Sequence, residues 1–140
     1  MLKHATKTQL AFLQNRFDAL LASEAIPFSA LTPSRVPKSE GVYVISAITN
    51  KVEIPYYVGR TRNLCQRLYT NHLMGSAAGA RLKKHLVSSG ECADMSAAKA
   101  FLREHCRVRW IEQCGHRERG AIEGYCTGLL FPKYGIYEEH

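Results

Sequence analysis

Residues 41–48 (GVYVISAI) and 55–60 (PYYVGR) are two short apolar segments that each combine a glycine with a tyrosine. Both are rich in β-branched and aromatic residues and predict strands, with Pro55 as the first residue of the second. Thr49-Asn50-Lys51 suits a turn between them, so we expect the strands to pair antiparallel. Glycine weakens a strand interior and often marks the close approach of another group. The sequence therefore predicts that something packs beside each tyrosine.

The rest of the chain alternates between helical and extended patterns. Residues 7–23 carry apolar side chains at three- and four-residue spacing and predict an amphipathic helix. A connector rich in proline and serine follows, up to residue 39. The same signals predict helices over 62–74, 78–88, 96–105 and 117–131, and a half-exposed strand over 107–113. Thr61 or Asn63 is the expected cap of the first of these helices, and Ser96 of the third.

This order of elements predicts an α+β fold. We expect a small three-stranded, mainly antiparallel sheet flanked by helices, with an extra N-terminal helix. A length of 140 residues fits one domain, and an apolar content of 46% is ordinary for a globular protein. The helix and connector are expected to occupy residues 1–39, and the main domain residues 40–137. The end of the chain, GIYEEH, suggests no regular structure.

The charge balance favours a polyanionic partner. Lysine and arginine number 19 against 12 acidic residues, which gives a formal charge of +7. The basic residues cluster in segments 60–67, 81–85 and 103–119. A basic surface that is merely solvated is the alternative, because charge alone does not separate the two readings.

Other features point to the cytoplasm. No apolar run approaches the roughly 20 residues of a membrane span, and the N-terminus lacks the apolar stretch of a secretory signal. The five cysteines are odd in number and form no CxxC pair, which favours reduced thiols over disulfides. His105, Cys106, Cys114 and His116 are grouped, but their spacing matches no usual zinc pattern. We expect a cytoplasmic protein without membrane contact.

One constellation spans residues 40–135. It comprises Gly41-Val42-Tyr43, Tyr57-Val58-Gly59, Arg67 eight residues later, Ile122-Glu123-Gly124-Tyr125 and Pro132-Lys133-Tyr134. Taken singly, Arg67 is better read as an arginine with its stem on the core and its head in water, and Glu123 as a solvated helical glutamate. Taken together, the pattern resembles the GIY-YIG nuclease superfamily.

The resemblance implies a metal-dependent endonuclease that hydrolyses DNA phosphodiester bonds, with Mg²⁺ or Mn²⁺ as cofactor. The family's site residues map onto Tyr43, Tyr57, Arg67 and Glu123, and His72 is a further candidate. The basic residues expected to bind nucleic acid are Arg60, Arg62, Arg81, Lys83 and Lys84. The N-terminal helix is a candidate surface for a homodimer, which cutting both strands of a duplex would require.

The implied chemistry fits these residue types. Mg²⁺ keeps several waters and takes one or two protein carboxylates, so Glu123 alone would be enough to hold it. Arg67 would offset the charge that develops on the phosphoryl oxygens. Tyr43 is the expected general base, since a nearby cation and Arg67 would lower the pKa of its phenol from about 10. Tyr57 is expected to orient water or phosphate.

Two positions depart from the family's pattern. Relatives carry histidine or tyrosine four residues after the helix arginine, where this chain has Asn71, and His72 follows at five. On a regular α-helix His72 would turn away from Arg67. Either the helix is irregular there, or His72 reads the nucleic-acid backbone from a different angle, or it is a core or capping histidine. Gly135 stands where relatives often carry an asparagine. A catalytically silent nucleic-acid-binding module of the same fold, or a protein-interaction domain, would be the competing function classes.

Overall fold

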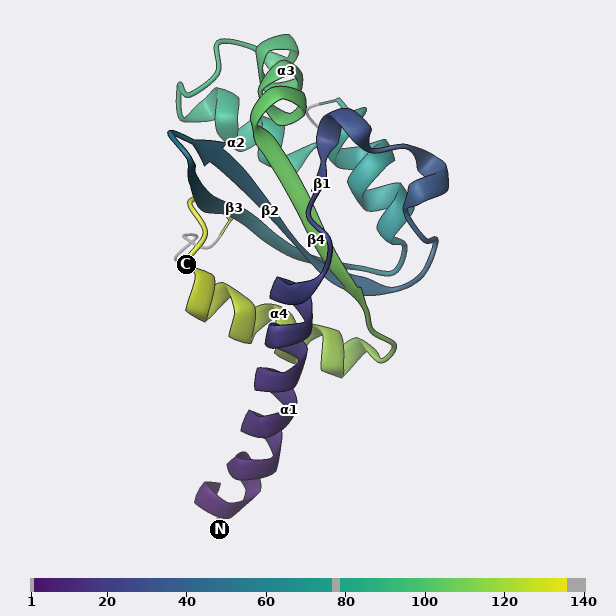
Figure 1. Ribbon diagram of the computed structural model, residues 1–140, viewed down its shortest axis with the longest axis vertical. Helices are drawn as coiled ribbons and strands as arrows, with labels where there is room; N and C mark the ends of the chain where they lie inside the picture. Colours follow the sequence, from purple (N-terminus) through teal and green to yellow (C-terminus); the bar gives the residue numbers. More distant parts are fainter. Residues whose placement is uncertain (1, 77–78, 136–140) are drawn as a thin grey trace.

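The computed structural model describes residues 2–76 and 79–135. A four-stranded antiparallel sheet forms its centre, in the order β1-β4-β2-β3 (Figure 1). The strands are β1 (Ile26–Pro27), β2 (Gly41–Thr49), β3 (Val52–Thr61) and β4 (Cys106–Glu112). The longer helices are α1 (Leu2–Ala22), η3 (Gln66–Leu73), α2 (Arg81–Ser88), α3 (Met95–His105) and α4 (His116–Leu130). The predicted α+β class is confirmed.

The sheet has four strands where three were predicted. The additional strand, β1, lies in the proline-rich connector, where Ile26 pairs with Val108 and Pro27 with Arg107. A strand of two residues is too short to show the alternation by which strands are recognised. The connector therefore forms one edge of the sheet.

The hairpin of β2 and β3 turns at Asn50 and Lys51, whose φ angles are 51° and 65°. Two consecutive residues with positive φ angles form a type I′ turn, whose twist matches that of the paired strands. The predicted turn is therefore confirmed. However, β3 begins at Val52, and Pro55 lies inside it at a β-bulge. The strand pairing shifts there and leaves Tyr56 without a direct partner. An edge strand at a bulge tolerates proline because no ladder hydrogen bond is lost.

Helices pack on both faces of the sheet, so β2 contributes side chains to two hydrophobic cores. In Figure 1, α2 and α3 lie above the sheet and α1 and α4 below it. Tyr43 and Ile45 of β2 pack with the first core, which includes η3, α2 and α3, while Val42 and Val44 pack with α1 and α4. Both faces of β2 are therefore buried.

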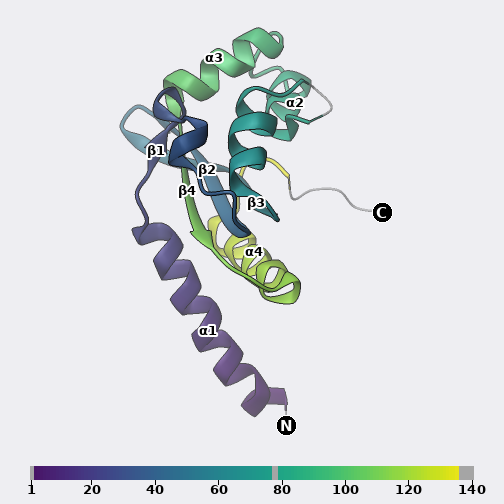
Figure 2. The same cartoon turned by 90° about the vertical axis from the view of Figure 1, so that its right-hand side faces the viewer.

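The N-terminal part of α1 projects away from the rest of the molecule (Figure 2). Of the residues in α1, only Leu20, near the C-terminal end of the helix, is fully buried, and Leu2 and Leu10 are exposed. The homodimer through this helix stays a prediction. Within the described ranges, no helix has the length and apolar character needed to cross a membrane.

Helix caps agree with the sequence in one case and differ in another. Asn63 Oδ1 accepts from the Gln66 amide at 3.0 Å, as expected. At α3, however, Asp94 is the cap, since its Oδ1 accepts from the Ala97 amide at 2.8 Å, and the prediction of Ser96 was wrong. The predicted start of a helix at residue 78 and most of the C-terminal tail lie outside the described residues.

Candidate active site

The two strand glycines make room for specific neighbours, as predicted. A Cβ atom at Gly59 would lie 2.3 Å from the Oη of Tyr43, its direct partner across the hairpin. A Cβ atom at Gly41 would lie 2.3 Å from the carbonyl oxygen of Ile111 and 2.8 Å from Leu64 Cδ1. Tyr43 itself thus fills the space beside Gly59, and its phenol is held flat across β3.

Four of the predicted site residues meet around this phenol. Tyr43 Oη lies 2.7 Å from His72 Nε2, and Arg67 Nε donates to the same oxygen at 3.3 Å. The Tyr57 ring lies 6.3 Å from the Tyr43 ring and 5.2 Å from the His72 ring, centroid to centroid. Arg67 also interacts with the Tyr57 side chain. These four residues come from β2, β3 and η3.

The winding of η3 explains how His72 reaches Tyr43. Residues 66–73 form a π-helix rather than the predicted α-helix, and the Met74 amide donates to the carbonyl five residues earlier, that of Tyr69, at 3.0 Å. In a π-helix the hydrogen bonds join residues five apart, so these residues are neighbours on successive turns. His72 therefore lies near Arg67 although five positions separate them. The irregular helix that the sequence left open is observed, and His72 is also a fully buried core residue.

Burial controls the protonation of the Tyr43–His72 pair. Tyr43 has no exposed surface, and desolvation raises the pKa of its phenol well above the ordinary value, with Arg67 acting in the opposite direction. Arg67 thus acts in the expected direction, but desolvation outweighs it and the pKa of Tyr43 is raised. Burial also lowers the pKa of His72 to about 3, helped by Arg67 and Lys83, so the imidazole is neutral at neutral pH.

The Tyr43 oxygen accepts from Arg67 Nε and shares a second hydrogen bond with His72 Nε2, in which the tautomer of the neutral imidazole decides the donor. The other ring nitrogen of His72, Nδ1, points away from this bond. This Nδ1 is buried and has no hydrogen-bond partner in the described part of the chain.

Glu123 reaches the same region from α4. A pocket of about 440 Å³ opens at the edge of β3, and its lining includes Tyr57, Arg81, Glu123, Pro132 and Gly135. Burial raises the pKa of the Glu123 carboxyl, while Arg60 and Arg67 act to lower it. Its ion pair with Arg60 is long, at 3.9 Å between Oε1 and Nε. The carboxylate therefore lies in the pocket with only partial compensation of its charge.

The family comparison can now be placed beside this geometry. The family model described as the GIY-YIG catalytic domain matches residues 39–129. This chain belongs to the GIY-YIG family. A comparison with curated proteins found no match.

Among solved structures, the chain is similar to the GIY-YIG N-terminal endonuclease domain of UvrC from Thermotoga maritima. Three point mutants of that domain, each bound to its catalytic divalent cation, match with 22%, 20% and 22% identity. Each match covers 73% of this chain and 88% of the other, with TM-scores of 0.44, 0.43 and 0.42.

Gly135 lies close to the Tyr57 ring. Its φ angle is +93°, and a Cβ atom there would lie 3.0 Å from Tyr57 Cε2. The backbone after Pro132 can therefore close over the Tyr57 ring only because residue 135 has no side chain. The departure from the family pattern replaces a polar side chain by direct backbone contact.

The basic residues predicted to bind nucleic acid divide into two groups. Arg81 lines the pocket of Glu123, Arg60 and Arg62 line a neighbouring pocket, and Lys84 is exposed. Lys83, by contrast, is only 3% exposed, and its Nζ donates to the carbonyls of Leu73 and Gly75 at 2.8 and 2.7 Å. The prediction for Lys83 was wrong, because its ammonium group caps the end of η3.

The sequence also gave no sign of a hydrogen-bonded cluster around Glu91. Its carboxylate accepts from Tyr56 Oη at 2.5 Å, Lys133 Nζ at 2.7 Å and Tyr134 Oη at 2.6 Å. The Tyr134 ring stacks on His85, with centroids 5.7 Å apart. Because Tyr134 lines the pocket of Glu123, this cluster holds one wall of the candidate site in place. An isolated glutamate in a loop carries no pattern that would have indicated this role.

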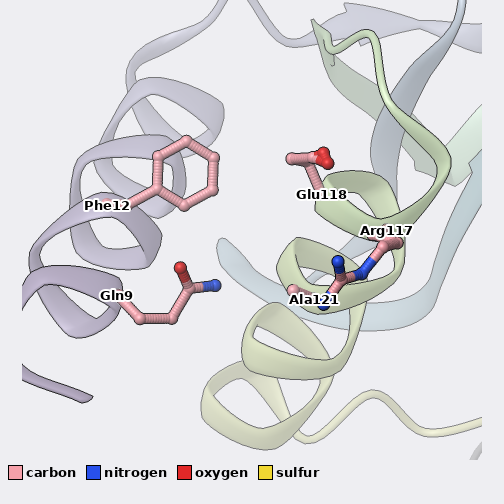
Figure 3. A pocket seen from close by; sticks show the side chains of 5 residues that line it. All are labelled: Gln9, Phe12, Arg117, Glu118 and Ala121. Atoms are coloured by element: carbon pink, nitrogen blue, oxygen red, sulfur yellow. The ribbon is translucent and has the colours of Figure 1, made fainter. Parts of the chain in front are cut away.

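A third pocket, of about 230 Å³, lies between α1 and α4 and is lined by Gln9, Phe12, Arg117, Glu118 and Ala121 (Figure 3). None of the predicted site residues is among those that line it. Within the described ranges, no three His, Cys, Asp or Glu side chains converge as a metal site. Glu123 is therefore the candidate metal ligand by its place in the pocket with Tyr57, without a second carboxylate beside it.

Proposed function

We propose that this chain is a divalent-cation-dependent endonuclease that hydrolyses phosphodiester bonds in DNA. The observation that supports this is the pocket at the edge of β3, where Glu123 and Tyr57 share one cavity and Arg67 interacts with both. A metal-binding carboxylate, a phosphate-binding guanidinium and a hydroxyl for the attacking water are the groups that this reaction needs.

Glu123 is the residue that would hold the cation. Its carboxylate is partly buried beside an open cavity and is only weakly compensated by Arg60, so a cation there would relieve the cost of its burial. Mg²⁺ and Mn²⁺ prefer oxygen ligands, and Mg²⁺ commonly takes one or two carboxylates and several waters. When bound, such a cation polarises the phosphate and stabilises the leaving oxygen.

Arg67 is the residue assigned to the phosphate. Its Nε is held by the Tyr43 oxygen, which fixes the guanidinium plane and leaves the terminal nitrogens to donate elsewhere. A guanidinium fixed in this way can bind two phosphoryl oxygens at once and stabilise the charge that develops on them. Tyr43 and His72 are then positioning residues that act through Arg67.

The assignment of the general base shifts from Tyr43 to Tyr57. Tyr43 is fully buried and its hydroxyl is hydrogen-bonded to His72 Nε2, so it has no access to a water in the pocket. Tyr57 lines the pocket together with Glu123. The Tyr57 oxygen is therefore the group that orients the attacking water and, in its deprotonated form, accepts the water's proton.

Nicking of supercoiled plasmid tests the proposal. We expect nicking with Mg²⁺ or Mn²⁺ and none with a chelator. Glu123→Gln is expected to reduce the rate by at least about 100-fold, the size of effect seen when one electrostatic contribution to a transition state is removed. Glu118→Gln is the matched control, since this residue lies on the same helix but in the pocket facing α1. DNA binding without cleavage under any divalent cation would favour the silent binding module instead.

A further inference from the structure

A second basic pocket adjoins the candidate active site. It has a volume of about 140 Å³ and is lined by Arg60, Thr61, Arg62, His116 and Arg119. Three arginines and a histidine around so small a cavity leave it open to one kind of ligand, an anion with several acceptor oxygens.

The two pockets follow each other along the boundary of β3 and α4. On α4, His116 and Arg119 line the basic pocket, while Glu123 and Thr127 line the catalytic one. Residues at this three- and four-residue spacing share one helix face. On β3, Tyr57 and Val58 line the catalytic pocket, while Arg60, Thr61 and, directly after the strand, Arg62 line the basic one. The two pockets therefore follow each other in opposite chain order on the two elements, as expected where β3 and α4 run in opposite directions.

Arg60 connects the pockets. A Cβ atom at Gly120 would lie 2.3 Å from Arg60 Nη1, so the guanidinium occupies the place that a side chain on α4 would take. Its Nε faces Glu123 at 3.9 Å, while the same residue lines the basic pocket. The missing side chain at position 120 thus lets one arginine reach both cavities.

Among the remaining lining residues, Arg119 is held by protein partners, whereas, within the described residues, Arg62 and His116 are not. Arg119 is 4% exposed, pairs with Glu40 at 3.0 Å and donates to the Gln113 carbonyl. Arg62 and His116 are exposed, and in the described part of the chain neither makes an ion pair or a side-chain hydrogen bond. Their donors are therefore available to a ligand.

We infer that this pocket binds a backbone phosphate of the nucleic acid, separate from the phosphate that is cleaved. This rests on the proposed function, in which DNA crosses the edge of β3. His116 and Glu123 are seven residues apart on α4, a rise of about 10 Å along the helix axis. The second phosphate would thus fix the position of the strand relative to the catalytic pocket, without reading its sequence.

The salt dependence of DNA binding tests this inference. Affinity of a labelled duplex is measured in chelator over a range of salt concentrations, so that no cleavage is needed. Arg62→Ala should weaken binding and reduce the slope of log K against log salt by about 0.9, the loss of one phosphate contact. Arg62→Lys should retain the slope, and His116→Ala should weaken binding several-fold.

Arg117→Ala is the matched control. It removes the same charge from the residue next to His116, but Arg117 lines the pocket facing α1 (Figure 3). It should leave the slope unchanged. A wild-type slope in Arg62→Ala, or an equal loss in Arg117→Ala, would overturn the inference even if plasmid is nicked. A reduced slope in Arg62→Ala alone, with no nicking, would support the pocket and reject the endonuclease.

Discussion

Tyr43 and His72 are joined by a hydrogen bond of 2.7 Å between Oη and Nε2, although 29 positions separate them in the chain. Both side chains are completely buried, and Arg67 donates to the same phenol oxygen. The pair therefore fixes the arginine on which phosphate binding would depend. The π-helical winding of η3 brings positions 67 and 72 onto neighbouring turns in this chain.

A double-mutant cycle should show that Tyr43 and His72 are coupled. Tyr43→Phe leaves the buried Nε2 of His72 without its hydrogen-bond partner, and His72→Phe removes the same bond from the buried hydroxyl of Tyr43. Each single change should destabilise the fold by about 1–3 kcal/mol. The double variant should lose less than the sum, by about 0.5–3 kcal/mol, in urea unfolding. Strictly additive losses would contradict a direct bond.

Shortening η3 by one residue tests the role of its winding. Thr70 is exposed, and its deletion would place the histidine four residues after Arg67, the spacing that an α-helix aligns. We expect this variant to nick plasmid within about tenfold of the wild-type rate, whereas His72→Ala loses about 100-fold or more. Circular dichroism would confirm that both variants fold. A folded deletion variant as slow as His72→Ala would show that the π-helix itself is required.

The sequence predicted the features that depend on residue type. It did not predict the features that depend on how a helix winds or where a strand bulges. Gly41 and Gly59 predict close approach because no other residue tolerates it, and the structure confirms both contacts. The bulge at Tyr56 and the π-helix each add one residue to an element without changing its apolar pattern, so periodicity does not reveal them. The prediction that Lys83 binds nucleic acid was wrong for another reason. Its partners are backbone carbonyls at the end of η3, and these carry no residue identity.

Lys83 should matter for stability and not for DNA binding. Lys83→Met keeps the aliphatic length but leaves the carbonyls of Leu73 and Gly75 without their donor, which should cost about 2–4 kcal/mol in urea unfolding. The exposed neighbour is the control, since Lys84→Met should change stability by no more than about 0.5 kcal/mol. The salt slope of DNA binding should be unchanged in Lys83→Met. A reduced slope would mean that Lys83 leaves the end of η3 and contacts phosphate.

Glu91 should make the fold sensitive to acid. Burial acts to raise the pKa of its carboxyl, but hydrogen bonds from Lys133, Tyr134 and Tyr56 lower it below the ordinary 4.5. Because the folded-state pKa is the lower one, this stabilisation is complete above about pH 4.5 and is lost as the pH falls through the folded-state value. At neutral pH, Glu91→Gln should therefore cost about 1–2 kcal/mol.

The measurement is the melting temperature of wild type and Glu91→Gln as a function of pH. The two curves should be separated by several degrees at neutral pH and should converge below pH 4.5. Because Tyr134 lines the catalytic pocket, nicking by the variant should also fall. Curves that run parallel through the acidic range would show that Glu91 makes no pH-dependent contribution.

Glu123 should show the opposite dependence, because its carboxylate is costly to bury. Burial raises its pKa against the effects of Arg60 and Arg67. A raised folded-state pKa means that the charged form destabilises the fold, so stability falls as the pH rises from the unfolded value through the folded one. Glu123→Gln should therefore melt slightly above wild type at neutral pH, and the difference should vanish in acid.

Divalent cation should reverse this order if Glu123 is its ligand. A cation that binds only the folded state stabilises by RT ln(1 + [L]/Kd), about 2.7 kcal/mol at one hundred times Kd. Mg²⁺ or Mn²⁺ should thus raise the melting temperature of wild type and of the control Glu118→Gln, and leave Glu123→Gln unchanged. Equal shifts in all three proteins would place the cation elsewhere. Since melting needs no DNA, the result bears on the metal ligand independently of cleavage.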